Sequence, residues 1–166
     1  AFKEVKQEAY KAHDVLILGF GCGSILHLFE KKYNVKPQIV GIEYDAQVLE
    51  LFESHFADNY SLQPELLAMD AEEYMNTCTR RFDIIFIDLF QELNNAPVVT
   101  KPEFIKQLAK AASNGTLVFN LTEQNKQDKA AIQELILQLS RYYKDVKRIS
   151  FQEYNQIIIA KQDKKA

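Results

Sequence analysis

Three carboxylates in this sequence, Glu43, Asp70 and Asp88, each follow an apolar run of the length expected for a buried strand. A fourth apolar run ends at Leu18 and is followed by closely spaced glycines. The carboxyl ends of parallel strands meet at one edge of a sheet, where ligands bind. An acid at a strand end also has a purely structural role, because it often caps the next helix. The four strand ends together predict a polar ligand pocket at one edge of a sheet.

The glycines occupy alternate positions, Gly19, Gly21 and Gly23, and an amphipathic segment begins directly after them at Ser24. Glycine has no Cβ, so it adopts left-handed conformations and lets a ligand lie against the backbone. The start of the following helix offers unpaired N–H groups to a polar or anionic ligand. A strand, a glycine turn and a helix start are typical of a nucleotide-binding loop.

Glu43 lies 20 residues after Gly23. A carboxylate at the end of the second strand accepts hydrogen bonds from ribose hydroxyls, which indicates an adenosine-like ligand. The glycine spacing here is G-x-G-x-G, whereas the dinucleotide fingerprint is G-x-G-x-x-G. Ser24 occupies the position where that fingerprint requires its third glycine. This difference counts against NAD, and an NAD-dependent oxidoreductase remains only a distant alternative.

Strands and helices alternate along the chain until the last two strands, which follow each other directly. The predicted strands are 15–18, 38–42, 66–69, 82–87, 116–121, 146–151 and 156–160. Helices are predicted from Ser24 to about Asn34, over the apolar residues from Val48 to Phe56, through Tyr74 and Met75, from near Pro102, and from roughly Lys126 to Tyr143. This order predicts an α/β fold: a three-layer αβα sandwich around a doubly wound, mostly parallel, seven-stranded sheet with a C-terminal antiparallel hairpin. A polar loop is expected from Leu89 to Lys101, and Phe52, Phe56 and Phe104 are expected in the core.

The 166 residues are enough for one domain spanning 1–166, with 1–13 as an N-terminal helix or arm and 162–166 as a frayed tail. The formal net charge of −3 gives no basic face for nucleic acid. No apolar stretch approaches the roughly 20 residues of a membrane helix. Cys22 and Cys78 form no metal-binding or disulfide pattern, and the three histidines have no ligand spacing, so we expect no metal and a reducing, cytoplasmic location.

The glycines, Glu43, the pair Asp70-Ala71 and the strand 82–88 together resemble the class I S-adenosylmethionine-dependent methyltransferase fold, and most closely its spermidine synthase-like branch. The resemblance covers nearly the whole chain, including the final hairpin. It implies that the cofactor is S-adenosylmethionine or decarboxylated S-adenosylmethionine.

The resemblance also implies roles for individual residues. Gly19, Phe20, Gly21, Cys22 and Gly23 would pass under the methionine part of the cofactor. Glu43 would hold the ribose and Tyr44 would lie beside the adenine. Asp70 would bind the adenine amino group, Ala71 would pack on the ring, and Asp88 and Leu89 would line the reaction centre.

The chain departs from the spermidine synthase pattern at a position that matters for the acceptor. Spermidine synthases carry a second Asp three places after the strand-four Asp, in a D-x-x-D pattern that binds the amine, and this chain has Gln91 there. The neighbouring Glu92 is an alternative carboxylate. Spermidine synthases also carry an amino-terminal β-domain, which residues 1–13 are too short to supply.

These departures make methyl transfer from S-adenosylmethionine to an unidentified small-molecule acceptor the first functional hypothesis. Asp88 is the predicted general base, because an activated sulfonium requires only alignment of the acceptor and removal of a proton. Aminopropyl transfer from decarboxylated S-adenosylmethionine and a non-catalytic nucleotide-binding module remain alternatives, and a homodimer remains an open arrangement.

Overall fold

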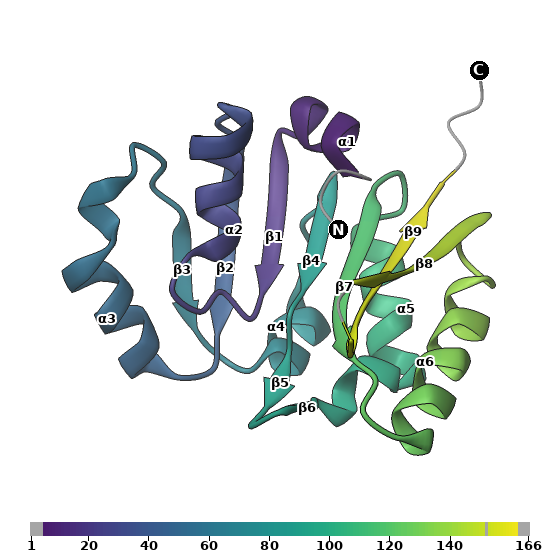
Figure 1. The fold of residues 1–166 in the computed structure, drawn as a ribbon. Helices are drawn as coiled ribbons and strands as arrows, with labels where there is room; N and C mark the ends of the chain where they lie inside the picture. The colour runs from purple at the N-terminus through teal and green to yellow at the C-terminus, as the bar shows by residue number, and fades with distance from the viewer. Residues whose placement is uncertain (1–4, 152, 163–166) are drawn as a thin grey trace.

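The computed structural model describes residues 5–151 and 153–162, and all structural statements below refer to them. Seven strands form one sheet in the order β3-β2-β1-β4-β7-β9-β8. The strands are β1 (Asp14–Leu18), β2 (Gln38–Glu43), β3 (Glu65–Ala68), β4 (Ile84–Ile87), β7 (Thr116–Thr122), β8 (Asp145–Phe151) and β9 (Asn155–Lys161). Five of them run parallel, and β9 pairs antiparallel with both β7 and β8. The predicted mostly parallel sheet with a C-terminal hairpin is confirmed (Figure 1).

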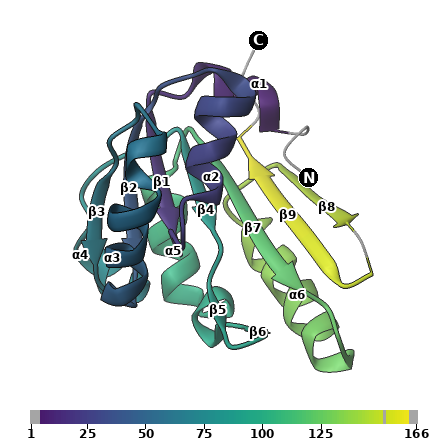
Figure 2. The same cartoon turned by 60° about the vertical axis from the view of Figure 1, so that its left-hand side comes forward.

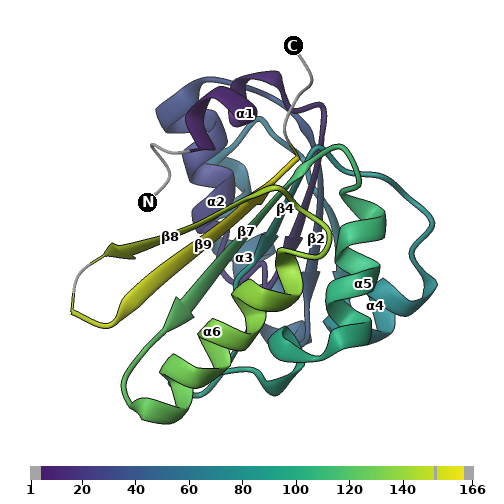
Figure 3. The ribbon, with the colours of Figure 1, turned by 90° about the vertical axis from the view of Figure 1, so that its right-hand side faces the viewer.

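Helices cover both faces of this sheet, so the molecule has the predicted three layers. One face carries α1 (Lys6–Lys11), α2 (Ser24–His27) and α3 (Ala46–His55), and the other carries α4 (Ala71–Thr77), α5 (Pro102–Ala111) and α6 (Lys126–Leu139). Figure 2 and Figure 3 show the two helical layers from the side. Each layer has its own apolar core against the sheet, because the central strands are buried on both faces.

Short polar side chains cap the starts of α3 and α6. The Asp45 carboxylate accepts the backbone N–H of Gln47 at the start of α3, and the Asn125 side chain accepts that of Asp128 in α6. Pro102 occupies the first turn of α5, where no N–H is lost. The segment predicted as one helix from residue 24 is α2 followed by a π-helical stretch, Leu28–Tyr33, which ends on Asn34 in the left-handed conformation.

Several boundaries differ from the prediction. β4 begins at Ile84 rather than at Phe82, because the Asp83 carboxylate accepts the N–H groups of His13 (2.8 Å) and Asp14 (3.1 Å) and fastens the chain before the strand starts. The last helix, α6, ends at Leu139 rather than at the predicted Tyr143. Phe56 is 39% exposed, so its predicted place in the core is wrong.

The expected loop from Leu89 to Lys101 contains structure of its own. A small antiparallel hairpin is formed by β5 (Phe90–Gln91) and β6 (Asn94–Asn95), and a 3₁₀ turn, Pro97–Thr100, follows it. The predicted arm at 1–13 contains α1, while residues 1–4 and most of the predicted tail at 162–166 lie outside the described residues. Within the described part of the chain, no helix is both long and apolar enough to cross a membrane.

Candidate functional site

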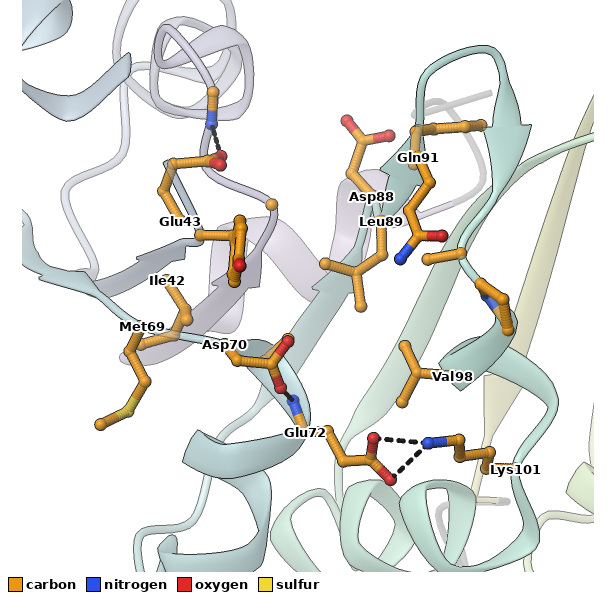
Figure 4. A pocket seen from close by; sticks show the side chains of 17 residues that line it. Ile42, Glu43, Met69, Asp70, Glu72, Asp88, Leu89, Gln91, Val98 and Lys101 are labelled. Carbon is orange, nitrogen blue, oxygen red and sulfur yellow. Dashed lines mark hydrogen bonds and ion pairs between the residues drawn. The ribbon is translucent and has the colours of Figure 1, made fainter. Parts of the chain in front are cut away.

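A cavity of about 700 Å³ opens at the carboxyl ends of β1, β2, β3 and β4. Eight residues predicted from the sequence line it, namely Gly19, Gly21, Glu43, Tyr44, Asp70, Ala71, Asp88 and Leu89. Figure 4 shows Glu43 and Asp70 on one wall and Asp88, Leu89 and Gln91 on the wall opposite. The prediction that the strand ends bring the three acids together around one cavity is confirmed.

The glycine turn fits closely between two strand ends. The N–H of Gly19 donates to the Ile42 carbonyl at 2.9 Å. Gly19 has φ +85°, and a Cβ there would lie 2.2 Å from the carbonyl oxygen of Asp88. A side chain at this position would therefore collide with the backbone of the proposed base, and only glycine fits.

Three of the five predicted loop contacts lie outside the cavity wall. Phe20 is buried against the sheet, where its ring meets Phe52 edge-on at 4.9 Å between centroids. Gly23 lies beneath the same Phe52 ring, which a Cβ would meet at 2.7 Å. Cys22 is exposed and does not line the cavity. Of the five loop residues, only Gly19 and Gly21 line the cavity.

Glu43 holds the glycine turn in place. Its Oε2 accepts the N–H of Gly21 at 2.9 Å, and its Oε1 accepts the N–H of Asp45 at 3.2 Å. Each carboxylate oxygen has a second acceptor position, so the group keeps capacity for two ligand hydroxyls. The predicted ribose-binding residue is therefore also part of the scaffold of the loop.

Asp70 has the structural role that the sequence left open. Its Oδ1 accepts the N–H groups of Glu72 (2.8 Å) and Glu73 (3.1 Å), so it caps α4, while the residue also faces the cavity. Ala71 is buried beside it. Tyr44 is 80% exposed and lies at the cavity mouth rather than inside it.

Asp88 is half-buried at the end of β4. Burial raises the pKa of its carboxyl, the amide of Asn120 lowers that pKa by donating a hydrogen bond at 2.8 Å, and the charge of Glu43 raises it further. Its net pKa lies above the ordinary value. An elevated pKa makes a carboxylate a better proton acceptor, so this environment suits a general base.

The sequence predicts only a polar loop for the segment after Asp88, whereas the structure makes this segment an ordered wall of the cavity. It contains Gln91 from β5, Val98 from the 3₁₀ turn, and an ion pair in which Lys101 Nζ lies 2.7 Å from a Glu72 oxygen. Figure 4 shows the Gln91 side chain on the same wall as Leu89. Glu92 lies in the turn of the hairpin with φ +56° and does not line the cavity, so it does not replace the missing second acid there.

The lining carries four carboxylates, those of Glu43, Asp70, Glu72 and Asp88, and one ammonium, that of Lys101. Since Lys101 is paired with Glu72, the rest of the cavity is acidic. The described residues contain no group of three or more His, Cys, Asp and Glu side chains suited to a metal ion. The arrangement can bind a cationic nucleoside, and it offers one half-buried carboxylate as a base.

A doubly wound sheet with a glycine turn and an acid at the end of its second strand defines the class of nucleoside-binding α/β domains. Residues 4–157 match the family model described as the spermine/spermidine synthase domain, so the chain belongs to that family. A curated relative, the polyamine aminopropyltransferase of Thermoplasma volcanium, is 26% identical over 137 residues, which are 80% of this chain and 49% of the relative. This chain thus spans about half the length of that relative.

Solved structures share the fold. Human methyltransferase-like protein 13 in complex with SAH superposes with a TM-score of 0.77 at 17% identity, covering 97% of this chain and 78% of that one. A probable spermidine synthase from Corynebacterium glutamicum has a TM-score of 0.75 at 20% identity, covering 89% of this chain and 55% of that one. A spermidine synthase in complex with the transition state analogue AdoDATO has a TM-score of 0.74 at 18% identity, covering 94% of this chain and 57% of that one. The class I methyltransferase fold, in its spermidine synthase-like branch, is confirmed.

Proposed function

We propose that this chain is the catalytic core of an aminopropyltransferase, which uses decarboxylated S-adenosylmethionine and transfers its aminopropyl group to an amine. The charge balance of the cavity carries this proposal: four carboxylates face one ammonium that is already paired. S-adenosylmethionine would bring a further carboxylate into this cavity. The decarboxylated cofactor has only its sulfonium and its ammonium, so an acidic cavity favours it.

The two ends of the cofactor match different parts of the cavity. The ribose would bind Glu43, whose oxygens keep free acceptor capacity, and the adenine would lie among the apolar groups of Ala71, Leu89 and Val98. The sulfonium side chain would then lie over the glycine turn and toward Asp88. The family match and the curated polyamine aminopropyltransferase relative support this reaction.

The transfer requires little covalent work from the protein. The lone pair of the acceptor nitrogen attacks the methylene carbon next to the sulfonium sulfur, the N–C bond forms, and the C–S bond breaks with its electron pair left on sulfur. The products are a neutral nucleoside thioether and the aminopropylated amine. Asp88 accepts the proton that the nitrogen gives up, and the cavity holds the two reactants in line.

Methyl transfer from S-adenosylmethionine is the second candidate, and Gln91 favours it. A diamine carries two ammonium groups, and an ammonium without a carboxylate partner is costly to desolvate. The cavity wall has a neutral amide at Gln91 where the resemblance leads us to expect a second acid, and Glu92 lies outside the cavity. A less highly charged acceptor would fit this wall better.

The experiment incubates the protein with decarboxylated S-adenosylmethionine or S-adenosylmethionine, each with putrescine or 4-amino-1-butanol, and identifies products by mass spectrometry. We expect aminopropylated product and the nucleoside thioether only with the decarboxylated cofactor. Asp88→Asn should abolish product formation, while Asp58→Asn, an exposed change outside the cavity, should not. A methylated product would replace the proposal with methyl transfer, and no product from any combination would contradict both.

A further inference from the structure

Asn120 stands beside Asp88 because of the strand register. In the parallel pair of β4 and β7, Ile87 is aligned with Phe119, so the next residues of the two strands, Asp88 and Asn120, are neighbours at the cavity edge. The Asn120 Nδ2 group donates to Asp88 Oδ1 at 2.8 Å. Both side chains are half-buried, so this contact is shielded from most of the solvent.

The rest of Asp88 is held by the backbone. Its N–H donates to the Leu18 carbonyl at 2.8 Å, and its own carbonyl lies against Gly19. Within the described part of the chain, Asn120 is the one side chain that donates to the Asp88 carboxylate, and Oδ2 accepts no hydrogen bond. One oxygen is therefore fixed and the other is available to a ligand.

The position of Asn120 is itself well fixed. Asn120 is paired with Ile157 of β9 in the antiparallel ladder. Two residues further on, the Asn95 side chain donates to the Thr122 carbonyl at 2.7 Å and accepts the Thr122 N–H at 2.8 Å. These contacts join the end of β7 to the β5–β6 hairpin that forms the cavity wall, so the amide donates from a rigid frame.

We propose that Asn120 is a positioning residue for the reaction: it holds Asp88 Oδ1 so that Oδ2 is directed at the proton of the reacting amine. This role rests on the proposed function of Asp88 as the base. Asn120 itself touches neither cofactor nor acceptor in this account. Its amide is short, so it reaches the neighbouring strand and leaves the cavity open.

The charges around Asp88 indicate a measurable consequence. The group facing it from β2 is the carboxylate of Glu43, which raises the pKa of Asp88, as burial does. The groups facing it from the other elements are neutral, namely Gly19 after β1, Asn120 on β7, and Phe90 and Gln91 on the hairpin. Asn120 lowers the pKa of Asp88, because its N–H stabilises the ionised carboxylate.

The test replaces the amide with an apolar group of similar size, Asn120→Leu, and with a carboxylate, Asn120→Asp. The first readout is the ¹³C NMR titration of the Asp88 side chain in the free protein. We expect an upward shift of about one pH unit in Asn120→Leu, since one hydrogen bond to the charged form is lost. We expect a larger upward shift in Asn120→Asp, because two adjacent carboxylates oppose each other's ionisation.

The second readout is the pH profile of kcat/KM for aminopropyl transfer. In Asn120→Leu its acid limb should move to higher pH by the same amount as the NMR titration, whereas a general structural defect would lower the rate equally at every pH. Asn76→Leu, an exposed change on α4 away from the cavity, is the matched control and should move neither readout.

Failure of this inference is separable from failure of the proposed function. An unshifted Asp88 titration in folded Asn120→Leu would overturn the role of Asn120 whether or not the protein transfers aminopropyl groups. A shifted titration in a protein that gives no product from any cofactor would confirm the contact and overturn its part in this reaction.

Discussion

Replacing Gly19 by alanine should destabilise the protein far more than the same change at Gly21. At both positions alanine must adopt a left-handed conformation, since φ is +85° at Gly19 and +55° at Gly21, and such a conformation costs about 1–2 kcal/mol. At Gly21 nothing lies within 4 Å of the added Cβ. At Gly19 the Cβ would meet the Asp88 carbonyl oxygen at 2.2 Å, well inside the 3.0 Å that real Cβ contacts respect.

The collision at Gly19 involves main chain on both sides, so no side chain can rotate away to relieve it. The end of β4 must move, which disturbs the bond from the Asp88 N–H to the Leu18 carbonyl. We expect Gly21→Ala to lower the free energy of unfolding by about 1–2 kcal/mol and Gly19→Ala to lower it by at least about 3 kcal/mol. Urea unfolding followed by circular dichroism measures both changes.

Gly21→Ala is the control, because it keeps the same loop and the N–H that donates to Glu43. Equal losses of stability in the two variants would refute the argument that Gly19 is required by its contact with Asp88. Greater loss at Gly21 would refute it as well, since only the left-handed conformation is strained there.

Three further variants test other parts of the structure. Folding raises the pKa of Asp88 above its ordinary value of 3.8, so ionisation of this carboxyl opposes folding. The variant Asp88→Asn should therefore be more stable than the wild type at pH 8. Urea unfolding across pH should show this advantage disappearing as the pH falls through the folded pKa toward 3.8. Tyr143→Phe removes the buried hydrogen bond from the Tyr143 hydroxyl to the Ala112 carbonyl (3.0 Å) and should lower the free energy of unfolding by about 1–3 kcal/mol in the same assay. The loss should be equal at pH 6 and pH 9, because burial raises the pKa of Tyr143 still further above that range; a loss that changed between these pH values would count against this contact. Lys101→Ala breaks the ion pair with Glu72, in which the Lys101 side chain is 52% exposed and that of Glu72 is 35% exposed. The free energy of unfolding should fall by less than about 1 kcal/mol, and by a smaller amount in 1 M salt. A loss several times greater would contradict a solvent-screened pair.

The main sheet could be predicted from the sequence because its central strands are buried on both faces. Runs such as 15–18 and 82–87 are almost wholly apolar and are followed by a glycine or an acid. These runs predict the strands, their order along the chain, and the sheet edge at which Glu43 and Asp88 meet. The exact start of β4 was not readable, because it depends on the bonds that Asp83 makes to residues about 70 positions away.

The cavity wall after Asp88 had no comparable signal. β5 and β6 have two residues each, too few for a hydrophobic period, and the hairpin turn places Glu92 rather than glycine at positive φ. Lys101 and Glu72 are separated by 29 residues and lie on different elements. Asn120 was visible at the end of a predicted strand, but its contact with Asp88 follows from the alignment of β4 with β7, which periodicity does not supply.

Calorimetric titration with decarboxylated S-adenosylmethionine and S-adenosylmethionine tests the central claim most directly. If the acidic cavity selects a cationic sulfonium nucleoside through Glu43, the decarboxylated form binds more tightly, and Glu43→Gln weakens it at least tenfold, a loss of about 1.4 kcal/mol. Glu53→Gln, an exposed change on α3 outside the cavity, should leave binding unchanged. Tighter binding of S-adenosylmethionine, or equal affinities in wild type and Glu43→Gln, would contradict the account.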